Sequence, residues 1–189
     1  MTGVIIHGHI EIYFLLHPDT AKDSNMEATC ISRSLDILME AKFNGSGVTE
    51  LSMPRSLVLN ADNTAREAKN QFFLAFCAAL VSANRFDWMD IDFAESGHTH
   101  NELDQRFSEL ATSLSSAPVL EDIHEFAAHL SANVKPVRGR LLHIEVLGHT
   151  CDFKSYLQPL GMGVSGIAPT HFDPDVYLIL IKLVKAFDC

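Results

Sequence analysis

Acidic, amide and imidazole side chains gather in two short stretches of this chain. Asp62 and Asn63 form the first stretch, directly after an apolar run. The second stretch holds two histidines and two acids, His98, His100, Glu102 and Asp104. Hard cations such as Mg²⁺ and Mn²⁺ prefer carboxylate oxygens as ligands, and a bound cation lowers the pKa of water and stabilises phosphoryl transfer. The two stretches therefore predict a cation-dependent site, provided that the fold brings them together.

The elements around these stretches predict a strand, a helix and a second strand. The apolar residues 57–59 are typical of a buried strand, and residues 62–64 (Asp-Asn-Thr) are expected to cap the following helix. In that helix, apolar residues recur at helical spacing from Phe72 to Leu80. Residues 88–93 alternate apolar with acidic side chains, as a half-exposed strand does. A strand–helix–strand unit has parallel strands, so both stretches should leave one edge of the same sheet.

The rest of the chain adds a hairpin, further helices and one more strand. Residues 4–16 predict a β-hairpin with its turn near Gly8, and residues 141–147 predict a strand. Amphipathic helices are expected after residue 24 and in residues 103–114 and 120–130. Residues 152–157 are expected to form a short helix or an extended segment. We expect a single domain over residues 1–189, in which residues 171–189 have no predicted place.

The composition narrows the class of protein. With 189 residues, of which 47% are apolar, the chain is long enough for one buried core. A net charge of −10 disfavours DNA as a partner, although a local basic patch could still bind it. Four cysteines without a CxxC pair indicate a reducing intracellular compartment, nucleus or cytoplasm. The most apolar stretch, residues 176–184, is too short to cross a bilayer, so no membrane association is expected; the oligomeric state stays open.

Motifs around both stretches resemble those of an uncharacterised domain family. Asp62-Asn63 followed by Glu67, Lys69 and Asn70 matches the pattern D-N-x-x-x-E-x-K-N. Gly97-His98-Thr99-His100 followed by Asp104, Phe107 and Ser108 matches the pattern G-H-T-H-x-x-x-D-x-x-F-S. Shorter matches lie within residues 2–8, 24–26 and 152–160, so that the resemblance extends over residues 2–170. The family is widespread in eukaryotic genomes, is associated with mobile elements, and is similar to RNase H-like DDE transposases and integrases.

The resemblance implies an RNase H-like mixed sheet with flanking helices, and metal-dependent phosphodiester hydrolysis or strand transfer. Asp62 would be the second acid of the site and Asp104, or else Glu102, the third, with Mg²⁺ or Mn²⁺ as the cofactor. Four residues, Asn63, Glu67, His98 and His100, would order the ligands and their loops. Lys69 and Asn70 would contact the phosphates of a DNA substrate. The first acid of the family lies on a strand upstream of the hairpin, which this sequence lacks, so an inactive, truncated copy is expected.

Other interpretations of the same residues stay open. A non-catalytic, transposon-derived remnant or a protein-interaction module would also explain an acidic chain with this pattern. The His98–His100 spacing occurs in zinc hydrolases too, although no third histidine follows it closely. Asp62 could simply cap a helix, and Asp104 could be a first-turn acid that the helix dipole stabilises.

Overall fold

The computed structural model describes residues 1–43, 54–61, 68, 70–93 and 102–157, and the structural statements below concern these residues. The elements along the chain are, in order, β1 (Thr2–Ile6), β2 (Ile10–Leu16), α1 (Ser24–Phe43), β3 (Ser56–Ala61), α2 (Gln71–Ser82), β4 (Trp88–Phe93), α3 (Glu102–Ser115), α4 (Ile123–Asn133), β5 (Leu141–Leu147) and α5 (Phe153–Leu157). The chain therefore has the mixed α/β architecture that its sequence predicts.

The first sheet has three strands in the order β1-β2-β5. β1 and β2 form the predicted antiparallel hairpin, and the turn between them contains Gly8 at φ +77°, a backbone conformation that favours glycine. β5 pairs with β2 in parallel, with Ile10 opposite Leu141 and Leu16 opposite Leu147. The sheet is therefore mixed, and its central strand is the most buried of the three.

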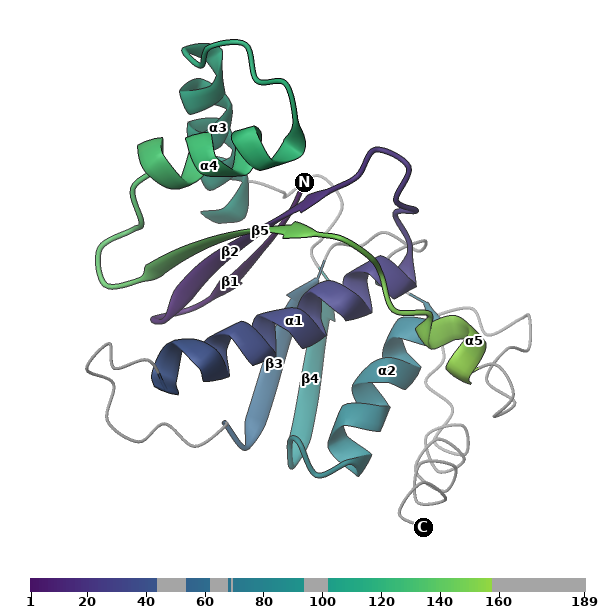
Figure 1. The fold of residues 1–189 in the computed structure, drawn as a ribbon. Helices are drawn as coiled ribbons and strands as arrows, with labels where there is room; N and C mark the ends of the chain where they lie inside the picture. Colours follow the sequence, from purple (N-terminus) through teal and green to yellow (C-terminus); the bar gives the residue numbers. More distant parts are fainter. Residues whose placement is uncertain (44–53, 62–67, 69, 94–101, 158–189) are drawn as a thin grey trace.

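Helices cover both faces of this first sheet (Figure 1). Ile12 and Phe14 of β2 pack against Met26 and Cys30 of α1 on one face. Tyr13 and Leu15 point to the other face, where they join a cluster formed with the α3 residue Leu110 and the α4 residue Leu130. Because strand side chains alternate between faces, β2 buries apolar side chains on both faces of the sheet and contributes to two of the hydrophobic clusters.

The second sheet consists of β3 and β4, which pair in parallel and are joined by α2. This confirms the predicted strand–helix–strand unit. The prediction that residues 57–59 are fully buried is wrong, because Val58 is 62% exposed. Side chains on both strands alternate between a half-buried inner face, which packs against α1 and α2, and an exposed outer face.

The described strands form two sheets, whereas the sequence predicts that they belong to a single mixed sheet. α1 explains the separation, because its side chains contribute to the cores beneath both sheets. Met26 and Cys30 pack against the first sheet, whereas Ala28 and Ile31 pack in the cluster beneath β3 and β4. Each sheet thus buries one face against a different side of the same helix (Figure 1).

The N-terminus of α2 differs from the prediction. The sequence analysis places the cap at residues 62–64, but the helix begins at Gln71 and Asn70 caps it. The Asn70 Oδ1 accepts hydrogen bonds from the backbone N–H groups of Phe72 at 3.1 Å and Phe73 at 3.2 Å. Asparagine in extended backbone conformation satisfies these first N–H groups well, so a local cap determines where the helix starts.

Candidate functional site

The carboxyl ends of β3 and β4 lie side by side. Ala61 at the end of β3 pairs with Phe93 at the end of β4. Asp62 follows Ala61 directly in the sequence, and α3 begins at Glu102, nine residues after Phe93. The chain thus leaves both strands at one edge of the sheet, as predicted. Six of the predicted site residues, Asp62, Asn63, Glu67, Lys69, His98 and His100, lie outside the described residues.

The first turn of α3 carries the other two predicted acids, Glu102 and Asp104. This turn packs closely on β1 at Gly3. A Cβ atom added to Gly3 would lie 2.7 Å from the Leu103 Cδ1 and 3.2 Å from the Phe107 ring. A side chain at this position would require Leu103 and Phe107 to adjust, so the small size of Gly3 allows the first turn of α3 to pack closely on β1.

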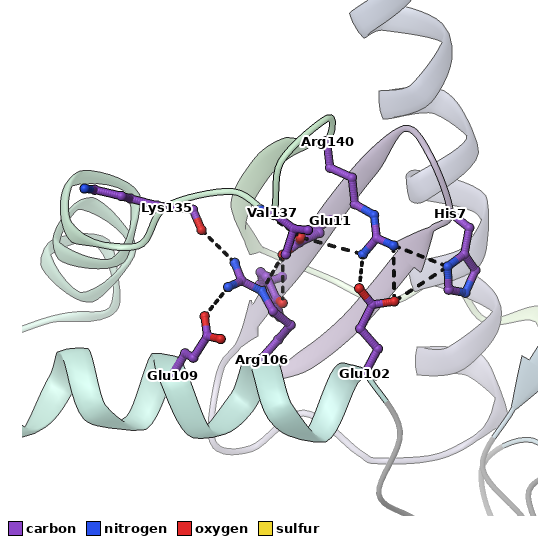
Figure 2. Close-up of polar contacts among 9 residues, drawn as sticks. His7, Glu11, Glu102, Arg106, Glu109, Lys135, Val137 and Arg140 are labelled. Carbon is purple, nitrogen blue, oxygen red and sulfur yellow. Dashed lines mark hydrogen bonds and ion pairs between the residues drawn. The ribbon is translucent and has the colours of Figure 1, made fainter.

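Glu102 pairs with Arg140, which precedes β5 (Figure 2). Both guanidinium Nη atoms of Arg140 donate to the Glu102 carboxylate, and the Nη2–Oε2 distance is 3.2 Å. The His7 Nδ1 lies 3.6 Å from the same carboxylate. The hydrogen bonds from Arg140 lower the pKa of Glu102 below its usual value, despite some opposition from burial. The Glu102 carboxylate is therefore ionised and engaged in a two-point ion pair.

A second ion pair lies beside the first and is buried. Glu11, the second residue of β2, has no exposed surface, and the side chain of Arg106 on α3 is 5% exposed. The Arg106 Nε donates to the Glu11 Oε2 at 2.7 Å, and the backbone N–H of Val137 donates to the Glu11 Oε1 at 3.2 Å. Arg140 is a second cation beside Glu11, because its Nη1 lies 3.8 Å from the Glu11 Oε1 (Figure 2).

Arg106 also connects α3 to the segment before β5. It donates to the backbone carbonyl of Lys135 at 2.9 Å and to the carboxylate of Glu109. Burial would lower the pKa of Arg106, but the hydrogen bond from Arg106 to Glu11 and the negative charge of Glu11 raise it above its usual value. Burial, and then the charge of Glu11, raises the pKa of the neighbouring Tyr13 to about 12.

We refer to Glu11, Arg106, Arg140 and Glu102 as the acid–arginine cluster. It holds α3, and with it the first-turn acids, against β2 and the segment before β5. The motif spacing in the sequence does not predict this cluster. A signal was present, because Glu11 is the only charged residue within the apolar strand Ile10–Leu16 and a buried carboxylate requires a cationic partner.

Asn70 belongs to a different polar group, at the start of three helices. The Ser24 Oγ donates to the Asn70 Oδ1 at 2.8 Å, and the Asn25 Nδ2 donates to the Asp152 Oδ1 at 3.0 Å. The Lys154 Nζ lies 2.7 Å from the Asp23 Oδ2. The motif segment at residues 24–26 thus contacts two others, Asn70 at the end of the first long motif and the segment 152–160. The side-chain Oδ1 of Asn70 both caps α2 and accepts the hydrogen bond from Ser24.

The described residues alone do not form a complete metal site, a reactive thiol site or a membrane span. No group of three His, Cys, Asp or Glu side chains within them is arranged to hold a metal ion. Burial raises the pKa of the Cys30 and Cys77 thiols to about 12, which disfavours nucleophilic thiolates at these positions. No helix in this part of the chain combines the length and the apolar character needed to span a bilayer.

Together, the fold and the cluster define a mixed α/β domain in which α3 is held against β2 and the segment before β5. Residues 1–175 match the family described as Domain of unknown function (DUF7869), and the chain belongs to this family. No curated protein and no solved structure matches the chain significantly.

Proposed function

We propose that this domain is RNase H-like and derives from a transposase or integrase, with a cation site at the carboxyl edge of β3 and β4. Asp62 and Asp104 are the proposed ligands of Mg²⁺ or Mn²⁺. The cation would lower the pKa of a bound water and stabilise negative charge during phosphodiester hydrolysis or strand transfer. Lys69, seven residues after Asp62 in the sequence, is the proposed phosphate contact.

The observation that carries this proposal is the parallel pairing of β3 and β4, with Ala61 opposite Phe93. Open α/β sheets bind ligands outside the carboxyl ends of their strands, where the chain leaves the sheet. Asp62 is the first residue beyond β3, and Asp104 lies in the first turn of the helix that follows β4. Acids on two segments that leave one edge are a suitable pair for a hard cation.

A second candidate function is that of a non-catalytic protein-interaction module, descended from the same kind of protein. Two observations favour it. The net charge of −10 opposes binding to a phosphate backbone. In addition, the Glu102 carboxylate is engaged with Arg140, so one of the two first-turn acids already serves in an ion pair that holds the fold.

Titration of the purified protein with Mn²⁺, followed by thermal unfolding, distinguishes the two functions. A ligand that binds only the folded state stabilises it by about 2.7 kcal/mol at a concentration of about 100 times its Kd. We expect the unfolding temperature of the wild type to rise with Mn²⁺. Asp62→Asn and Asp104→Asn should each abolish most of this rise.

Asp36→Asn is the matched control, because Asp36 is an exposed acid on α1 and its replacement should leave the Mn²⁺ response unchanged. A wild type without any Mn²⁺ response would contradict the cation site and leave the interaction module as the function. A response to Zn²⁺ that is lost in His98→Ala but kept in Asp62→Asn would instead indicate a histidine-ligated zinc hydrolase.

A further inference from the structure

The outer face of β3 and β4 is uncovered by the residues that the structure describes. Val58 on β3 is 62% exposed and Trp88 on β4 is 52% exposed. The other outward side chains are all exposed too, namely Ser56, Asn60, Asp90 and Asp92. Parallel strands are almost always covered on both faces, so an open face on a parallel pair indicates a missing cover.

The chemistry of this face defines what could cover it. Along β4, the apolar Trp88 is followed on the same side by two acids, Asp90 and Asp92. The register places Val58 opposite Asp90. The face is therefore apolar at one end and acidic towards the other. A segment that buries Val58 and Trp88 and also carries positive charge would match it.

The chain contains such a segment beyond the end of the family match. Residues 176–187 read VYLILIKLVKAF, in which the only charged residues are Lys182 and Lys185. The family match ends at residue 175, so this segment lies beyond the matched residues. An apolar stretch of this length needs a surface on which to bury its side chains. Its two lysines give the segment a positive charge in a chain of net charge −10.

We propose that residues 176–187 dock on the outer face of β3 and β4 of the same chain. The apolar side chains of the segment cover Val58 and Trp88. Lys182 and Lys185 are the partners of Asp90 and Asp92. The docked segment completes the burial of the parallel pair.

Trp88 provides the test, because it is the only tryptophan in the chain. In the full-length wild type we expect short-wavelength emission and weak quenching by acrylamide. Reversing both charges in Lys182→Glu/Lys185→Glu should shift the emission to longer wavelength and increase the quenching. The same charge change at two exposed lysines elsewhere, Lys22→Glu/Lys135→Glu, should leave both signals unchanged. Circular dichroism verifies that every variant is folded.

A charge swap makes the test specific. Adding Asp90→Lys/Asp92→Lys to the Lys182→Glu/Lys185→Glu variant should restore the wild-type emission and quenching. The proposal is overturned if the lysine reversals leave Trp88 unaffected, or if the swap fails to restore its protection. It is also overturned if the protection of Trp88 depends on protein concentration, because a second copy would then be the cover.

Discussion

Arg106→Met is expected to lower the free energy of unfolding by about 3–5 kcal/mol, the usual effect of removing one partner of a buried ion pair. Arg106 donates to Glu11 at 2.7 Å, and Glu11 has no exposed surface. Methionine has a similar volume but no charge, so the substitution leaves the Glu11 carboxylate without its closest cation. Chemical denaturation at neutral pH measures the effect.

Two further variants test whether the loss of stability comes from breaking the buried ion pair, and not from the removal of any arginine. Arg85→Met removes an exposed arginine and should change the stability by less than about 0.5 kcal/mol. Glu11→Leu/Arg106→Met removes both charges, and we expect it to be more stable than Arg106→Met alone, because no buried carboxylate remains. If Arg106→Met were no more harmful than Arg85→Met, the cluster would not hold α3 in place.

Arg140→Glu should be the next most harmful substitution, with a loss of up to about 3 kcal/mol, the upper end of the usual range for single substitutions. It places a carboxylate beside both Glu102 and Glu11, where Arg140 now donates to one and lies 3.8 Å from the other. Adding Glu102→Arg restores an opposite-charge pair and should recover part of the loss. Failure of this double variant to recover any stability would contradict a direct Glu102–Arg140 interaction.

The double variant Arg140→Glu/Glu102→Arg also tests whether Glu102 is a ligand at the proposed cation site. If Glu102 only positions the first turn of α3, the swapped variant should keep the Mn²⁺ response of the wild type. If Glu102 is itself a ligand, the response is lost even though the stability recovers.

The Glu102–Arg140 ion pair also makes the stability of the fold depend on pH. Because Arg140 lowers the pKa of folded Glu102, the stability that Glu102 adds is present at neutral pH and is lost as the pH falls through that lowered pKa.

Elements with a strong local signal were predictable from the sequence. Two arms rich in β-forming residues on either side of Gly8 predicted the hairpin of β1 and β2, and the run 141–147 coincides with β5. The strand–helix–strand pattern predicted that β3 and β4 are parallel, because a crossover helix returns the chain in the same direction. These features depend on local periodicity and on general rules of chain connection.

Features that depend on tertiary neighbours were not predictable. The exposure of Val58 depends on which elements cover the second sheet, which the apolar run itself does not reveal. The start of α2 depends on competition between possible caps, and Asn70 gains a further hydrogen bond from Ser24, 46 residues away. Glu11 and Arg106 are 95 residues apart, so no spacing rule could pair them. Glu102 shows the same limit, because its partner Arg140 lies near β5.

The central claim is that Asp62 and the first turn of α3 share one cation at the carboxyl edge of β3 and β4. Crystals grown with Mn²⁺ and measured for anomalous scattering test it most directly. The account predicts one peak at about 2–2.6 Å from carboxylate oxygens of both Asp62 and Asp104, the range for hard cations with oxygen ligands. An electron-density map that separates the two carboxylates by packed side chains, with no shared peak, would contradict it.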